Sequence, residues 1–149
     1  MPNNVLYYQS MIDFCNVAGE WVNKTALLDD IRNGDPTSPD SIKTLAKYYD
    51  GDVNVLANKR KAIASKANNS WFMIRDLLKA EKCWSQEDDD AFVALIKKPT
   101  EYCDFRAKVR DWARNELERE RKGKESVFYD LRSLIDRYQK LILKRNQKR

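Results

Sequence analysis

Clustered lysines and arginines are the residues of this sequence whose type and spacing are best suited to chemistry. The densest group, the first basic group, consists of Lys59, Arg60, Lys61 and Lys66. No acidic residue stands between Asp52 and Asp76, so no neighbour in the sequence neutralises these charges. Cations of this kind bind phosphate groups, and the binding weakens steeply as the salt concentration rises. Arg60 also falls in line with the apolar Leu56 and Ile63, so its charge must reach solvent or a partner.

The second basic group lies between residues 101 and 122 and consists of Arg106, Arg110 and Arg114. Their four-residue spacing places all three on one ridge of a helix. A planar guanidinium group donates two parallel hydrogen bonds to a phosphate. Acidic residues of the same segment stand at helical spacings that allow them to pair with these arginines. Both a phosphate-binding ridge and an internally neutralised ridge remain open.

The third basic group ends the chain and consists of Arg137, Lys140, Lys144, Arg145 and Lys148. Spacings of three and four residues put most of them on one face of a helix, beside its apolar stripe. The helix dipole favours cations at a C-terminal end even without a ligand. This group is therefore either a phosphate-contacting face or an ordinary solvated face.

Catalysis finds little support in the residues present. The sequence has no histidine, which removes the commonest general base and the commonest metal ligand. Cys15, Cys83 and Cys103 are far apart, so we expect small buried side chains in a reducing compartment rather than a zinc site. The acidic run at 88–90 fits the first turn of a helix better than a cation site. We expect no enzyme activity, no cofactor and no metal.

The charge of the chain is unevenly distributed. Its net value is +5, from 28 basic and 23 acidic residues. Residues 101–149 carry 15 basic against 9 acidic side chains, and residues 40–82 carry 9 against 5. Residues 1–39 carry 2 against 5 and are acidic. Two basic regions favour a polyanion or an acidic protein surface as the partner.

The elements that position these groups are expected to be helices, because apolar residues recur at intervals of three and four without strand-like alternation. Capping residues and glycines predict helices from Asn3 or Asn4 to about Asn23, from Thr25 to Gly34, from Pro39 to Asp50, from Asp52 onward, from Ser85 to Pro99, from Thr100 to about Lys122, and from Ser126 onward. The polar run at 68–70 leaves open whether residues 53–82 form one helix or two.

The sequence therefore predicts an all-α fold, with residues 1–149 forming a single domain. We expect a compact helical bundle of about six to eight helices. The last two helices, joined at Gly123, are expected to pair as a long antiparallel hairpin spanning about 101–147. No apolar run approaches the length of a membrane span, and we expect a cytoplasmic protein.

Two further patterns bear on nucleic acid. The stretch from Ile42 to Leu56 resembles a helix-turn-helix, with the first basic group on its second helix. Gly51 falls one residue late for that motif, and a generic capped helix pair accounts for the same residues. The tryptophans are most simply core or interface anchors. Trp71 and Phe72, which follow the first basic group, are the residues placed to stack on a base.

Two functions of different classes fit the sequence. The leading one is nucleic-acid binding without catalysis, through phosphate contacts from all three basic groups, as an accessory subunit of a larger complex. The residues do not distinguish RNA from DNA. The alternative is a protein-interaction module, such as an adaptor, an immunity protein or an inhibitor, whose basic faces dock an acidic partner.

Overall fold

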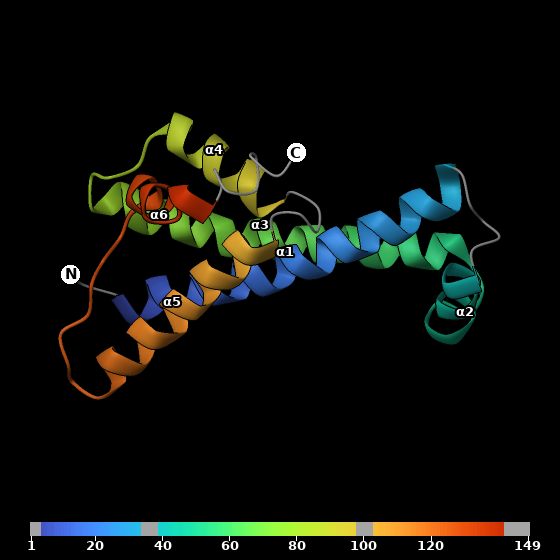
Figure 1. Ribbon diagram of the computed structural model, residues 1–149, viewed down its shortest axis with the longest axis horizontal. Coiled ribbons are helices and arrows are strands. Elements are labelled where there is room, and N and C mark those ends of the chain that lie inside the picture. The colour runs from blue at the N-terminus through green and yellow to red at the C-terminus, as the bar shows by residue number, and fades with distance from the viewer. Residues whose placement is uncertain (1–3, 34–38, 98–102, 142–149) are drawn as a thin grey trace.

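The computed structural model describes residues 4–33, 39–97 and 103–141, and these residues form six α-helices and no strand. The helices are α1 (Asn4–Asn33), α2 (Pro39–Tyr48), α3 (Val53–Ala80), α4 (Gln86–Ile96), α5 (Cys103–Arg121) and α6 (Leu131–Arg137). The predicted all-α fold is confirmed over this part of the chain. α1 and α3 are the longest helices, and they run side by side along the molecule (Figure 1).

The N-terminal segment is one helix of 30 residues, so the predicted break between Asn23 and Thr25 is wrong. Asn and Thr favour helix ends when local preferences act alone. Here the flanking apolar residues Val22 and Leu28 are both buried. A break would turn one of them away from the packing surface, and tertiary packing therefore overrides the local preference.

Residues 53–80 also form one uninterrupted helix, which settles the question that the sequence left open. Asp52 begins this helix as predicted, because its carboxylate accepts a hydrogen bond from the backbone N–H of Asn54. The polar run at 68–70 stays helical since Trp71, directly after it, is buried on the same face as the residues before it. Burial of that continuous face outweighs the local preference of the polar residues.

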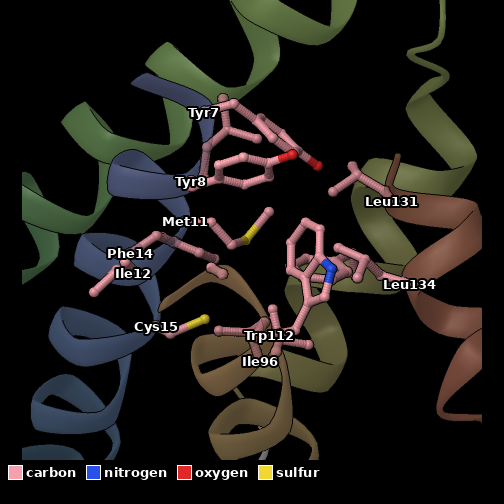
Figure 2. Close-up of a cluster of buried hydrophobic side chains, with 14 of the residues drawn as sticks. Tyr7, Tyr8, Met11, Ile12, Phe14, Cys15, Ile96, Trp112, Leu131 and Leu134 are labelled. Atoms are coloured by element: carbon pink, nitrogen blue, oxygen red, sulfur yellow. The ribbon is translucent and has the colours of Figure 1, made fainter. Parts of the chain in front are cut away.

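The main hydrophobic core lies at one end of the molecule. α1 packs between α3 and α5, and α4 and α6 cover this end (Figure 1). Figure 2 shows that aromatic rings and aliphatic side chains from several helices meet there. The largest fully buried side chains include Tyr7, Tyr8, Phe14, Phe92 and Phe105. Rings of this size each bury a large apolar area, so they dominate the packing of this end.

A second, smaller core lies at the other end of α1 and α3, next to α2 (Figure 1). Its buried members are Leu28, Tyr49 and Leu56. Where the main core ends, the buried Ala18 and the half-buried Ala64 line the seam of α1 and α3, and the surface is hollowed there. The long helix pair is therefore packed tightly at its ends and opens to solvent near its middle.

The chain between α5 and α6 is not helical, although the sequence predicts a helix from Ser126. Side chains of α1 and α5 form hydrogen bonds with its backbone groups. The Tyr7 hydroxyl donates a hydrogen bond to the carbonyl of Tyr129 at 2.6 Å, and the Glu116 carboxylate accepts one from the backbone N–H of Val127 at 2.7 Å. A helix beginning at Ser126 would compete for the Tyr129 carbonyl, so these contacts favour the open segment.

α6 therefore begins at Leu131, capped by Asp130, and it packs against α4. The long antiparallel hairpin predicted for about 101–147 is not confirmed. α6 spans seven residues, and residues 142–149 lie outside the described part of the chain.

Candidate nucleic-acid interface

The first basic group lies on α3, whose residues from 53 to 75 include no carboxylate. Lys59, Lys61 and Lys66 are exposed, and none of them forms an ion pair with a described residue. Helical spacing puts Lys59 and Lys66 on one side of α3 and Lys61 on another. Lys59 also lies over a ring of the smaller core, with its Nζ 5.5 Å from the centroid of Tyr49. These three ammonium groups are available to a ligand.

Arg60 is half-buried, and its partner is an aromatic ring on α1. The guanidinium carbon lies 5.4 Å from the centroid of the Trp21 ring. The Nζ of Lys97, the residue that ends α4, lies 5.4 Å from the same centroid. Neither cation forms an ion pair with a described residue. Two cations from different helices thus converge on one half-buried indole.

Trp21 and Lys97 form the common wall of two hollows. The first hollow, of about 240 Å³, is also lined by Ala18, Arg60, Ala64, Ala67 and Asn68. The second hollow, of about 270 Å³, is also lined by Val22, Thr25, Ala26, Asp29 and Asp30. Among the described lining residues, the first hollow has two cations and no acid, whereas the second has two acids and one cation, Lys97. The two hollows therefore favour ligand groups of opposite charge.

Only one residue of the predicted stacking pair is accessible. Phe72 is 55% exposed, but Trp71 is 8% exposed and packs inside the main core. The Trp71 ring stacks on Phe92 with an angle of 10° between the planes, and its Nε1 donates to Asp89. The expectation that Trp71 offers a ring to a base is therefore wrong, because burial removes it from any ligand.

Cations and rings alternate along α3 beyond Phe72. The guanidinium carbon of Arg75 lies 5.9 Å from the centroid of Phe72 and 5.1 Å from that of Trp84. The Nζ of Lys79 lies 4.6 Å from the centroid of Trp84. Arg75 also forms an ion pair with the buried Asp89 at 3.1 Å, so part of its charge is already neutralised. Phe72 and Lys79 remain exposed.

The second basic group does not present three free arginines. Arg106 donates a hydrogen bond to the carbonyl of Ile96 at 2.9 Å, and Arg110 lies 3.4 Å from Asp111 in an ion pair. Both also line a hollow of about 360 Å³ between α1 and α5, together with acidic residues of these helices. Arg114 is exposed. Two of the three arginines thus have partners within the protein.

The third basic group is described in part. The guanidinium carbon of Arg137 lies 5.3 Å from the centroid of Tyr129 and 5.9 Å from that of Tyr138. Lys140 is exposed. The remaining members, Lys144, Arg145 and Lys148, lie outside the described residues.

The three groups do not form one continuous surface over the described part of the chain. α1 separates α3 from α5, and α6 lies at the end where α4 packs (Figure 1). The structure instead brings Arg60 to Trp21 and Lys97, which the sequence analysis did not select. Trp21 carried the signal of a core residue, and Lys97, although followed by Lys98, belongs to none of the three basic groups. Only the awkward position of Arg60 indicated that a partner was needed.

Two findings concern other classes of site. In the described part of the chain, no group of three or more His, Cys, Asp or Glu residues is arranged to hold a metal ion. None of the helices described has both the length and the apolar character needed to cross a membrane.

No protein-family model, curated protein or solved structure matches the chain. The proposals below therefore rest on the residues and their geometry.

Proposed function

We propose that the protein binds nucleic acid without catalysing a reaction, and that α3 makes the principal phosphate contacts. The observation that supports this is the stretch of α3 from residue 53 to residue 75, which exposes Lys59, Lys61 and Lys66 and has no carboxylate. On α5 and α6 part of the charge is compensated, because ion pairs join Arg110 to Asp111, Lys122 (just after α5) to Glu118, and Arg132 to Asp136. Lys108 and Arg114 of α5 form no ion pair with a described residue, but they stand on a helix that also carries carboxylates. The exposed lysines of α3 therefore carry positive charge that no carboxylate of a described residue compensates, whereas the charge of the paired cations is already compensated.

Binding at this surface is driven by the release of counterions from the nucleic acid. Residues 61–79 of α3 extend over about 27 Å of helix axis, enough to follow several phosphates of a strand. Phe72 lies within this stretch and exposes its ring, and such a ring stacks only on an unpaired base. We therefore expect single strands to bind more tightly than a duplex. The protein acts in this proposal as a cytoplasmic accessory subunit.

The experiment is binding of labelled single-stranded RNA, single-stranded DNA and duplex DNA over a series of salt concentrations. The triple variant K59A/K61A/K66A should lower the slope of log affinity against log salt by about 2 for single strands. The matched variant K108A/K122A/K124A removes the same charge from exposed positions in α5 and just after it. It should change the slope by about 0.5 or less, which separates a local contact from net charge.

Equal effects of the two triple variants would contradict a site on α3, because they would show that only net charge matters. Absence of binding at low salt would remove the proposal altogether. A preference for RNA or DNA among the single strands would identify the natural ligand class.

The alternative function, docking on an acidic protein, is favoured by one observation. Phe72 and Met73 are adjacent on α3 and are 55% and 40% exposed. Exposed large apolar side chains beside lysines are typical of protein interfaces. A nuclease-resistant complex with an acidic protein, lost in the variant F72S/M73S, would support this function in place of nucleic-acid binding.

A further inference from the structure

We infer that the first hollow binds a single nucleotide, with the base against the indole of Trp21 and the phosphate between Arg60 and Lys97. The inference deepens the proposed function and rests on it only where the nucleotide is a unit of a strand. A free nucleoside monophosphate presents the same chemistry, namely a flat aromatic ring joined to a phosphate.

The charge of the first hollow favours an anion. Arg60 and Lys97 both line it, and none of its described lining residues is acidic. Neither cation has an ion-pair partner among the described residues, although both lie 5.4 Å from the centroid of one ring. A phosphate in this hollow supplies both cations with a counter-charge and accepts the parallel hydrogen bonds of the guanidinium group.

The shape of the hollow favours a flat ring of modest size. Ala18, Ala64 and Ala67 leave space along the seam of α1 and α3, and the resulting volume is about 240 Å³. This lies just below the range of about 300 Å³ and more that is typical of sites for larger small molecules. Trp21 is half-buried and lines this hollow, and purines and pyrimidines stack on indole rings. The Asn68 amide adds a donor and an acceptor for the edge of the base.

The second hollow determines the orientation of the ligand. Asp29 and Asp30 line it, beyond the wall formed by Trp21 and Lys97, and their carboxylates repel a phosphate. The phosphate therefore lies in the first hollow.

The test is a titration of the full-length ¹⁵N-labelled protein with adenosine 5′-monophosphate, followed through the indole N–H signals. The variant Trp21→Phe lacks the indole N–H, so the signal that disappears in it belongs to Trp21. Phenylalanine keeps an aromatic ring at this position. We expect the nucleotide to shift this signal. Adenosine alone and inorganic phosphate alone should bind about tenfold more weakly or worse, because each lacks one half of the contacts.

A pair of matched variants tests the phosphate contact. Arg60→Gln should weaken nucleotide binding by about tenfold, since it removes a charged hydrogen-bond donor. Arg121→Gln removes the same charge from an exposed arginine at the end of α5, which lines neither hollow. It should change the affinity by less than about twofold. Thermal unfolding of both variants checks that each is folded.

Three outcomes overturn the inference. The first is the absence of a shift at Trp21 with both the mononucleotide and a single strand of about eight nucleotides. The second is inorganic phosphate binding as tightly as the nucleotide, which would show an anion site without stacking. The third is an equal loss of affinity in Arg60→Gln and Arg121→Gln. A shift with the mononucleotide supports a free nucleotide, and a shift with the strand alone supports a unit of a strand.

The same titrations separate this inference from the proposed function. The proposed function alone is supported, and the nucleotide site overturned, if strand binding depends on Lys59, Lys61 and Lys66 while neither the strand nor the mononucleotide shifts the Trp21 signal. Mononucleotide binding at Trp21 without any strand binding supports the nucleotide site and overturns the proposed function.

Discussion

Nε1 of Trp71 lies 3.1 Å from Oδ1 of Asp89 and donates a hydrogen bond to it across the contact of α3 and α4. Nε1 of Trp84 donates to Oδ2 of the same carboxylate at 3.0 Å, and Arg75 forms an ion pair with it. Asp89 is only 5% exposed, so these three groups replace the water that its charge loses on folding. One carboxylate therefore joins α4 to α3.

Asp89→Asn should lower the free energy of unfolding by about 2–3 kcal/mol, because the amide removes the charge and turns a donor towards other donors. Urea denaturation of the two proteins measures the difference. Asp90→Asn is the matched control, since Asp90 is exposed and stands next in the sequence. It should change the stability by about 0.5 kcal/mol or less. Equal losses in the two variants would show that Asp89 has no special role.

Glu116→Ala should loosen the chain between α5 and α6. The buried carboxylate of Glu116 accepts the backbone N–H of Val127, and its removal leaves that donor without a partner. We expect a loss of about 1–3 kcal/mol and faster cleavage by trypsin after Lys122 and Lys124. Glu118→Ala removes an exposed carboxylate from the same helix and should leave both the stability and the cleavage rate nearly unchanged. A cleavage rate in Glu116→Ala like that of the unaltered protein would contradict this role.

Lys82→Gly should stabilise the protein. Lys82 follows α3 with a left-handed φ of 58°, and the backbone N–H groups of Lys82 and Cys83 bond to the carbonyls of Lys79 and Leu78. Glycine adopts this conformation without the strain of a side chain, so we expect a gain of about 0.5–1 kcal/mol. Lys79→Gly, inside the helix, should instead lose about 1 kcal/mol. Thermal or urea denaturation measures the stability of both variants. A loss of stability in Lys82→Gly would contradict the expectation.

Alkaline pH should destabilise the protein through Cys15. Burial raises the pKa of its thiol from 9.0 to about 12, against the opposing charges of Arg106 and Arg110. Between these values the unfolded chain loses a proton that the folded protein keeps, so stability falls as the pH rises. The stability advantage over Cys15→Ala should therefore shrink by about 1.4 kcal/mol per pH unit above pH 9. Urea denaturation of both proteins from pH 8 to pH 11 measures this difference. If their free energies of unfolding changed with pH in parallel, the prediction would be contradicted.

Some helix ends were predictable because a residue type with a known preference marks them. Ser85 and Gly123 were assigned correctly, because Ser85 accepts a hydrogen bond from the N–H of Asp88 and Gly123 adopts a φ of 70°. α3 ends with the same pair of backbone hydrogen bonds as α5, but a lysine takes the place of the glycine. Lysine carries no signal for a left-handed residue, so the extent of α3 could not be read from its end.

Contacts between residues distant in the sequence could not be predicted from the sequence. It indicated that Arg60 needs a partner, but Trp21 and Lys97 become neighbours only when α1, α3 and α4 meet. The false break in α1 and the false start at Ser126 have the same origin. In both places packing or hydrogen bonding with another helix decides the conformation, and no local pattern reports it.

The two cores at opposite ends of α1 and α3 give the molecule two levels of resistance to opening. Among the described residues, the smaller core buries Leu28, Tyr49 and Leu56. Amide protons around the smaller core should exchange with solvent through a partial opening. Amide protons near Phe14 should exchange only when the whole protein unfolds. Arg60 and Trp21 lie between the two regions, so a ligand held by both would slow exchange at the weaker end.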